Sequence, residues 1–323
     1  MRFASILLAA AVAGSAADRP ALAVVEKVAG AVGFYTEDGR QVGLVKVGPF
    51  PHEAVLSADG RTLFVSVNGV LWMTEDAQGA NAIAVVDVAT MRKTAEIDLG
   101  RFHRPHGLAL LRDGRLLATT ERPFGLILVD PRERRVVRDY DVKGKSPHMV
   151  IPTSDGGRAF VSDVDSDSVA EIRLADGAVR SIATGAHPQG GVFSSDGRFL
   201  YMTNTEGNQI SIIDAQAAAV AGNIPTGKGP ARIALAPGGR TLVYNLQFEP
   251  AVGFADIAAR QQVAAVPLPG RPLSLTLSKD GRLAFAGLQE VDKIAIVSVA
   301  ERKVERVLDL PKGSGPDVVL ALR

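Results

Sequence analysis

Histidine is rare in this chain, and its placement follows a pattern. The sequence has 323 residues and five histidines, of which His52, His106 and His148 each directly follow a proline. The other two, His103 and His187, lie within two residues of a proline. Neutral imidazole is a common ligand for zinc, copper and iron, and three convergent rings can leave one coordination position open. The pattern therefore favours a histidine-rich site that could hold one of these metals.

Other polar residues could complete such a site. Glu53 directly follows His52, and Glu121 lies in the segment after His106. Either carboxylate could orient an imidazole or act as general acid or base, so both are acid–base candidates, while no catalytic residue is identified. The candidates for holding a polar ligand are Gln189 and Asp317, which also follow prolines, and Arg122 and Arg232, which suit a carboxylate or phosphate.

Composition and motifs exclude several function classes. The 36 Lys and Arg residues balance 35 Asp and Glu residues, giving a net charge of +1 and no positive patch for nucleic acid. Cysteine is absent, which excludes disulfides and thiolate ligands. The chain also contains no Gly-x-Ser-x-Gly, His-Glu-x-x-His or Cys-x-x-Cys-His sequence, so common serine hydrolase, zinc protease and haem sites are not predicted.

An internal repeat accounts for the prolines. Repeat units start near Pro51, Pro105, Pro147, Pro188, Pro230, Pro272 and Pro316. An Asp-Gly or Gly-Gly pair follows each of the first six at the same offset, and most units are about 42 residues long. Each unit reads as four short strands joined by turns, and helical periodicity is absent. This predicts an all-β, seven-bladed β-propeller with four antiparallel strands per blade.

The two ends of the chain complete one blade. After Pro316 only one strand remains, whereas residues 23–28, 31–35 and 41–47 form three strands before the first full unit. We therefore expect the C-terminal strand to pair with three N-terminal strands, which removes exposed sheet edges. A single propeller domain is predicted over residues 24–323.

The repeat brings the residues that follow the prolines to one place. Each proline lies in the loop that leads to an inner strand, so these residues should surround one mouth of the central channel, where propellers usually bind ligands. The alternative is that Pro-His serves the loop itself, with imidazoles bonding backbone carbonyls.

The first full unit carries about 12 extra residues, placed at 69–80, with the only tryptophan. Trp72 is expected either to cover the mouth and meet a ligand or partner, or to pack on its own blade.

The chain resembles the YVTN-type β-propeller repeat proteins. The residues that carry the resemblance are Leu200–Asn204 followed by Asn208–Asp214, with a looser copy in Phe160–Asp163 and Ser168–Ile172. The resemblance spans the repeats and implies architecture. Similar propellers include exported binding proteins, domains of copper, haem and quinone enzymes, and lactone hydrolases, so it does not choose an activity.

The first residues resemble a secretory signal peptide. Arg2 precedes an apolar run from Phe3 to about Ala13, and small residues follow at Ser15–Ala17 and Ala21–Ala23. We predict a signal peptide over residues 1–23 and a periplasmic or secreted protein. The apolar run is too short to span a bilayer as a helix, so no membrane span is expected.

These observations lead to two functional hypotheses. The first is an exported binding or interaction module, expected to be a monomer, that holds a small molecule or protein partner at the histidine-bearing mouth. The alternative is a metal-dependent hydrolase or oxidoreductase with His52, His106 and His148 as ligands and zinc, copper or iron as the metal. The sequence makes no cofactor certain.

Overall fold

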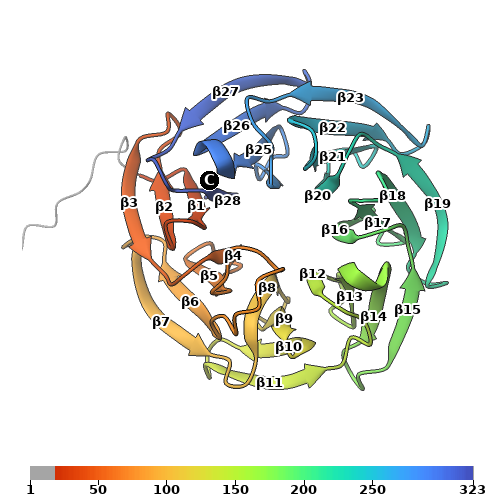
Figure 1. Ribbon diagram of the computed structural model, residues 1–323, viewed down its shortest axis with the longest axis horizontal. Coiled ribbons are helices and arrows are strands. Elements are labelled where there is room, and N and C mark those ends of the chain that lie inside the picture. The colour runs from red at the N-terminus through yellow and green to blue at the C-terminus, as the bar shows by residue number, and fades with distance from the viewer. Residues whose placement is uncertain (1–18, 323) are drawn as a thin grey trace, which may run out of the picture.

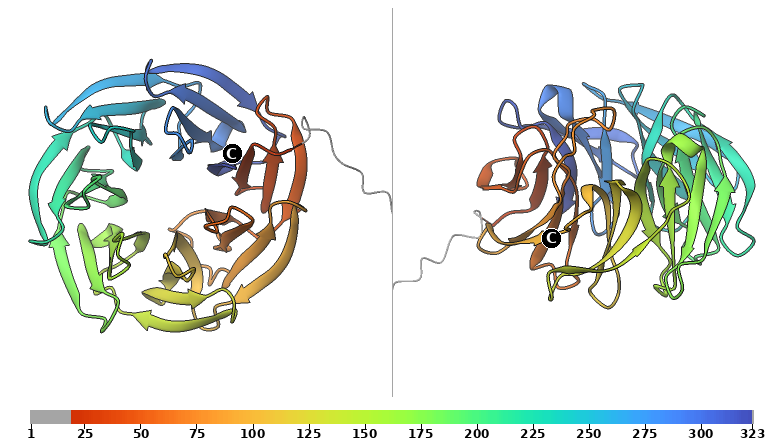
Figure 2. Two further views of the ribbon diagram at one scale, coloured as in Figure 1. Left: turned by 180° about the vertical axis from the view of Figure 1, so that it is seen from behind. Right: turned by 60° about the horizontal axis from the view of Figure 1, so that its bottom comes forward.

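The computed structural model describes residues 19–322 and forms a ring of seven four-stranded antiparallel sheets around a central axis (Figure 1). The closing blade contains β28 (Pro316–Ala321), β1 (Leu22–Glu26), β2 (Ala31–Tyr35) and β3 (Gln41–Lys46). The all-β, seven-bladed architecture predicted from the repeats is thus confirmed. Figure 2 shows the ring from behind and in a tilted view.

The other six blades follow in chain order. Blade 1 contains β4 (Pro51–Leu56), β5 (Thr62–Val67), β6 (Ala82–Asp87) and β7 (Arg92–Asp98); blade 2 contains β8 (His103–Leu110), β9 (Leu116–Arg122), β10 (Phe124–Asp130) and β11 (Arg135–Tyr140). Blade 3 contains β12 (Pro147–Pro152), β13 (Arg158–Asp163), β14 (Ser168–Arg173) and β15 (Val179–Ala183); blade 4 contains β16 (Pro188–Phe193), β17 (Phe199–Asn204), β18 (Gln209–Asp214) and β19 (Ala219–Pro225). Blade 5 contains β20 (Pro230–Leu235), β21 (Thr241–Leu246), β22 (Ala251–Asp256) and β23 (Gln261–Pro267); blade 6 contains β24 (Ser274–Leu277), β25 (Leu283–Leu288), β26 (Lys293–Ser298) and β27 (Lys303–Asp309). Two short 3-10 helices, η2 (Val164–Ser166) and η3 (Gln289–Val291), follow β13 and β25.

Turn chemistry explains the hairpin that joins the first two strands of a blade. In blade 4, Gly197 has a φ of 71°, which a residue with a side chain rarely adopts. The Asp196 carboxylate accepts hydrogen bonds from the Ser194 hydroxyl at 2.5 Å and from the Arg198 amide at 3.0 Å. These bonds stabilise the tight turn, so the repeated Asp-Gly pair fixes the register of the strands around it.

The hydrophobic core lies between neighbouring blades. One cluster joins Leu117 and Leu126 of blade 2 to Val150 and Val161 of blade 3, and all four side chains are buried. The middle strands are apolar on both faces because each blade packs against a neighbour on either side. The outermost strands, such as β19, are mostly exposed. The position of every blade is therefore set by the next one.

A set of buried hydroxyl groups links each blade to the next near the axis. Ser66 donates to the carbonyl of His106 at 2.9 Å, and Thr119 donates to the carbonyl of His148 at 2.7 Å. Ser162 and Thr203 make the equivalent bonds to Gln189 and Ala231. In each case the acceptor is the residue directly after the proline. The repeat therefore fixes the backbone of these residues through hydroxyl groups rather than through the imidazoles.

The ends of the chain pair as the sequence predicts. Strand β28 is antiparallel to β1, with Val24 opposite Val319, and β1 pairs in turn with β2. Strand β1 begins at Leu22, so the propeller starts two residues before the predicted boundary at residue 24. Residues 1–18 of the predicted signal peptide lie outside the described residues. Among residues 19–322, no helix is long and apolar enough to cross a membrane.

Candidate functional site

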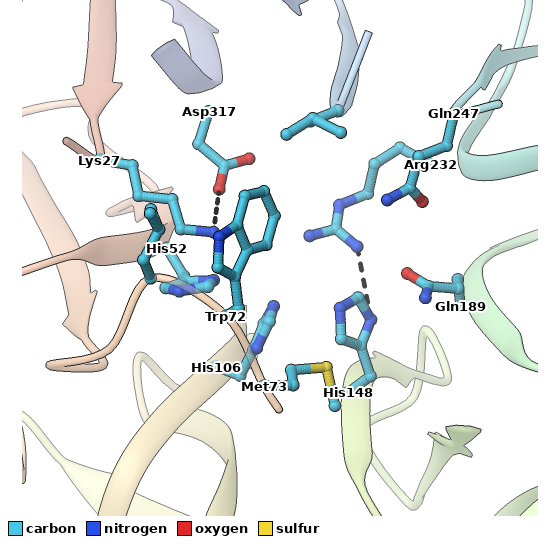
Figure 3. Close-up of a pocket in the computed structure, with 12 residues that line it drawn as sticks. Lys27, His52, Trp72, Met73, His106, His148, Gln189, Arg232, Gln247 and Asp317 are labelled. Carbon is cyan, nitrogen blue, oxygen red and sulfur yellow. Dashed lines mark hydrogen bonds and ion pairs between the residues drawn. The ribbon is translucent and has the colours of Figure 1, made fainter. Parts of the chain in front are cut away.

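Most of the predicted site residues meet in one cavity at a mouth of the propeller, which we call the mouth cavity (Figure 3). Its volume is about 110 Å³. The lining residues are Lys27, His52, Leu71, Trp72, Met73, His106, His148, Gln189, Arg232, Gln247, Leu273 and Asp317. They come from all seven blades, because each blade sends the start of an inner strand or a loop to the axis.

The three histidines stack against one another in series. The ring centroids of His52 and His106 are 4.4 Å apart, those of His106 and His148 are 4.1 Å apart, and both pairs are tilted. All three side chains are buried. Burial is the main cause that lowers the pKa of each imidazole; the neighbouring Lys27 lowers it further in all three, and Arg232 does so in His106 and His148. The stack is therefore neutral at pH 7.

The hydrogen bonds of the stack indicate which ring nitrogens donate a proton and which accept one. His52 Nε2 lies 3.2 Å from the carbonyl of Val70, to which it donates, and Arg232 Nη1 lies 3.5 Å from His148 Nδ1. His106 Nδ1 lies 3.1 Å from Glu121 Oε1 and donates to this carboxylate. His106 Nε2 is buried and has no hydrogen-bond partner among residues 19–322. Its lone pair is thus free, and its ring lines the cavity.

The predicted three-histidine metal site receives no support from this arrangement. Within the described part of the chain, no three His, Cys, Asp or Glu side chains are placed so that they could hold a metal ion. The rings of His52, His106 and His148 lie one against the next instead of converging on one point. The rings are oriented by packing against one another and by hydrogen bonds to groups outside the stack, namely the Val70 carbonyl and the Glu121 carboxylate.

Charges around the cavity are paired. Glu53 forms an ion pair with Arg232, and Lys27 lies 3.7 Å from Asp317. Burial raises the pKa of Glu53 to about 7, while the nearby Arg232 guanidinium opposes the shift. Burial lowers the pKa of Lys27, and Asp317 opposes that change. A ligand therefore meets two cations that each have a carboxylate partner close by.

The extra loop of blade 1 covers one side of the mouth. Trp72 and Met73 line the cavity, and the Lys27 ammonium lies 5.2 Å from the centroid of the Trp72 ring. The insertion lies between β5 and β6, where the sequence places it. Trp72 thus lines the cavity and also remains 45% exposed.

A buried arginine fixes this loop to the site. The Arg104 guanidinium donates to the carbonyls of Met73 at 2.9 Å and Glu75 at 2.8 Å, and it forms an ion pair with Glu121 at 2.6 Å. Glu121 is also the partner of His106. A continuous set of polar contacts therefore runs from the loop through Arg104 and Glu121 to the central histidine.

Three predicted site residues lie outside the cavity, and others were missed. Glu53 is not among the lining residues, although its partner Arg232 is. Glu121 sits behind His106, while Arg122 points outward and pairs with Asp76 at 2.7 Å. Lys27 was not among the candidates, although it lies near the end of the strand predicted over residues 23–28. Arg104 was also missed, and its position directly before Pro105 was the available signal.

Comparison with known proteins places the chain in a family. The sequence model of the family described as "Lactonase, 7-bladed beta-propeller" matches residues 131–305, which is more than half of the chain. The chain belongs to this family. A protein of Salmonella typhimurium, "Uncharacterized protein YncE", is 25% identical to this family member over 202 residues. The match covers 61% of this chain and 54% of the relative, so it spans about half of the relative's length.

Solved structures share the fold of this lactonase-family chain. The periplasmic gluconolactonase PpgL of Pseudomonas aeruginosa has a TM-score of 0.74 at 18% identity, over 92% of this chain and 97% of that one. A functionally unknown protein from Desulfotomaculum acetoxidans has a TM-score of 0.77 at 13% identity, over the same shares of 92% and 97%. Hydrazine synthase of Kuenenia stuttgartiensis has a TM-score of 0.67 at 18% identity, covering 80% of this chain and 86% of its own. At these identities the likeness concerns the fold.

Proposed function

We propose that the mouth cavity binds a small, oxygen-rich molecule of the lactone class and promotes its hydrolysis. One observation carries the proposal: the His106 ring lines the cavity, its buried Nε2 has no partner among residues 19–322, and its Nδ1 donates to the buried carboxylate of Glu121. An imidazole held in this tautomer by a carboxylate is suited to accept a proton from water. Arg232 lies at the same cavity and suits the oxygen that gains charge as the ring opens.

The role of Glu121 follows from its contacts. When His106 accepts a proton at Nε2, the ring becomes a cation, and the Glu121 carboxylate next to Nδ1 stabilises it. Glu121 is itself held by Arg104 at 2.6 Å and by the Asn68 amide at 3.3 Å. Burial raises the pKa of Glu121, while Arg104 and Asn68 lower it, so these partners favour the ionised form.

Family membership and fold support the class of ligand. The family name is Lactonase, and the similar PpgL structure is titled a periplasmic gluconolactonase. The cavity of about 110 Å³ suits a compact molecule. Gln189 and Gln247 offer amides to its hydroxyl or carbonyl groups. Binding alone, as an interaction module for a small molecule, is the minimal form of the same proposal.

The proposal also includes the place of action. Residues 1–23 have the charge, apolar run and small residues of a secretory signal peptide. We therefore propose that the protein acts in the periplasm or outside the cell as a monomer.

The experiment is a hydrolysis assay of the full chain against a panel of small lactones, with His106→Ala and Glu121→Gln beside the unchanged protein. His106→Ala is expected to lower kcat/KM by about 10²–10⁴-fold, because it removes the proton acceptor. His187→Ala is the matched control, since His187 is partly exposed and pairs with Glu206 away from the cavity. Undiminished hydrolysis by His106→Ala would refute the catalytic role. Calorimetric binding of a lactone without turnover would leave binding as the function of the cavity.

A further inference from the structure

Lys27 is a buried amine in the mouth cavity that the proposed hydrolysis does not use. It follows β1 in the closing blade, and its side chain extends along the cavity wall toward Asp317 (Figure 3). The residue is only 5% exposed. Trp72 covers the ammonium from one side at 5.2 Å. A lysine side chain in such a position is unusual, because lysine normally keeps its charge in water.

The groups that face Lys27 determine how readily it loses its proton. Burial in the cavity wall lowers its pKa, Asp317 raises it, Arg232 lowers it, and Glu53 raises it. The overall direction is downward. His52, whose own pKa is lowered by burial and by Lys27, adds no positive charge at neutral pH. The neutral amine, which is the nucleophilic form, is therefore easier to reach here than on an exposed lysine.

The cavity contains partners for a small carbonyl compound. Its volume of about 110 Å³ is well below the roughly 300–1,000 Å³ of typical ligand pockets, so only a few non-hydrogen atoms can enter. Arg232 suits a carboxylate, and its partner Glu53 has a pKa of about 7, so protonation of Glu53 makes the guanidinium available. The free His106 Nε2 can accept a proton beside the same space.

We infer that Lys27 is a covalent carbonyl-binding site, which forms an imine with small 2-oxo acids whose carboxylate pairs with Arg232. The neutral amine nitrogen attacks the carbonyl carbon, and one of its two protons passes through His106 Nε2 to the carbonyl oxygen, which gives a carbinolamine. The hydroxyl group then leaves with the second nitrogen proton as water, and a carbon–nitrogen double bond remains. The overall change is amine plus 2-oxo acid giving imine plus water, with no oxidation or reduction.

This inference uses the same cavity as the proposed function but does not require lactone hydrolysis. The two proposals depend on different side chains. Hydrolysis requires His106 as proton acceptor, whereas imine formation requires the Lys27 amine. Loss of selective labelling with intact His106-dependent hydrolysis would overturn only this inference. Selective labelling of Lys27 without any hydrolysis would overturn only the proposed function.

The experiment traps the imine on the full chain at pH 7. The protein is incubated with pyruvate and sodium cyanoborohydride, and the carboxyethyl group left on each lysine is quantified by peptide mass spectrometry over time. Lys27 is expected to be labelled at least about tenfold faster than exposed Lys228 and Lys312, since each unit of pKa lowering raises the neutral amine fraction about tenfold. The same reaction in urea is the control for folding, and there the preference is expected to disappear.

A variant tests the electrostatic part of the inference. Asp317→Asn removes the carboxylate that stabilises the Lys27 ammonium, so labelling of Lys27 should become faster than in the unchanged protein. Lys27→Arg should lose the label at this position while exposed lysines react as before. Labelling of Lys27 at or below the rate of Lys228 and Lys312, both in the unchanged protein and in Asp317→Asn, would overturn the inference.

Discussion

Replacement of Arg104 by methionine removes the group that joins the loop over the mouth to the central histidine. Arg104 is fully buried and contacts Glu121, Met73 and Glu75 through its guanidinium. Methionine keeps much of the side-chain length. The backbone of Arg104 already has a φ of 56°, and methionine has to adopt the same conformation, so the change tests the charge rather than the turn.

The expected loss of stability comes mainly from Glu121. Without Arg104 the carboxylate stays buried without a cation, and breaking a buried pair from one side typically costs about 3–5 kcal/mol. The loop carbonyls of Met73 and Glu75 lie near the surface and can bond to water, so their lost hydrogen bonds add less, at about 1 kcal/mol each. We therefore expect the free energy of unfolding to fall by about 5–7 kcal/mol in total.

The assay is equilibrium unfolding in urea at pH 7, combined with a double-mutant cycle. Glu121→Gln is measured alone and together with Arg104→Met. The double variant should be at least about 2 kcal/mol more stable than the sum of the two single losses predicts, because it leaves neither the Glu121 carboxylate nor the Arg104 guanidinium buried without its partner. Arg101→Met is the matched control, since its ion pair with Asp139 is exposed and should contribute at most about 1 kcal/mol. A loss below about 1 kcal/mol for Arg104→Met, or strict additivity with Glu121→Gln, would refute the reasoning.

Two further predictions concern stability and processing. Asp163 is buried without a hydrogen-bond partner for Oδ1 among residues 19–322, and burial raises its pKa to about 8, so the unchanged protein should lose stability as pH rises from about 4 to 8. Asp163→Asn, which introduces the residue found at the same register in blade 4, should flatten this decline in urea unfolding; an unchanged pH profile would contradict it. N-terminal sequencing of exported protein should find cleavage after Ala17 rather than Ala23, because Leu22 and Ala23 are buried in β1. A start at residue 24 would show that β1 tolerates their loss.

Much of the fold could be predicted because the repeat carries it. Prolines at regular intervals and Asp-Gly turns at a constant offset mark strand starts and hairpins, and these features depend on local backbone chemistry. The closing strand pair was predictable too, because incomplete units at the two ends complement each other. The same repeat brought the residues after the prolines to one mouth, so His52, His106 and His148 could be placed together without coordinates.

The metal hypothesis shows where sequence reasoning stopped. Three histidines at equivalent repeat positions must be neighbours, but their ring orientations depend on what each ring packs against. His106 turns its Nδ1 toward Glu121, and His52 bonds to a carbonyl of the inserted loop. No repeat rule contains those contacts, since Glu121 and the insertion are features of single blades.

By itself, the sequence determined the seven-bladed architecture, its closure and the ring of residues at the mouth, because periodic turns and strands are local signals that symmetry repeats. Only the tertiary structure decided that Glu121 backs His106 while Arg122 points away, since successive strand residues face opposite sides and the register selects which one faces inward. Only the structure also brought Lys27 to Asp317, which lie near opposite ends of the chain. Their contact depends on how two individual side chains are placed in the closing blade, which the repeat pattern does not specify.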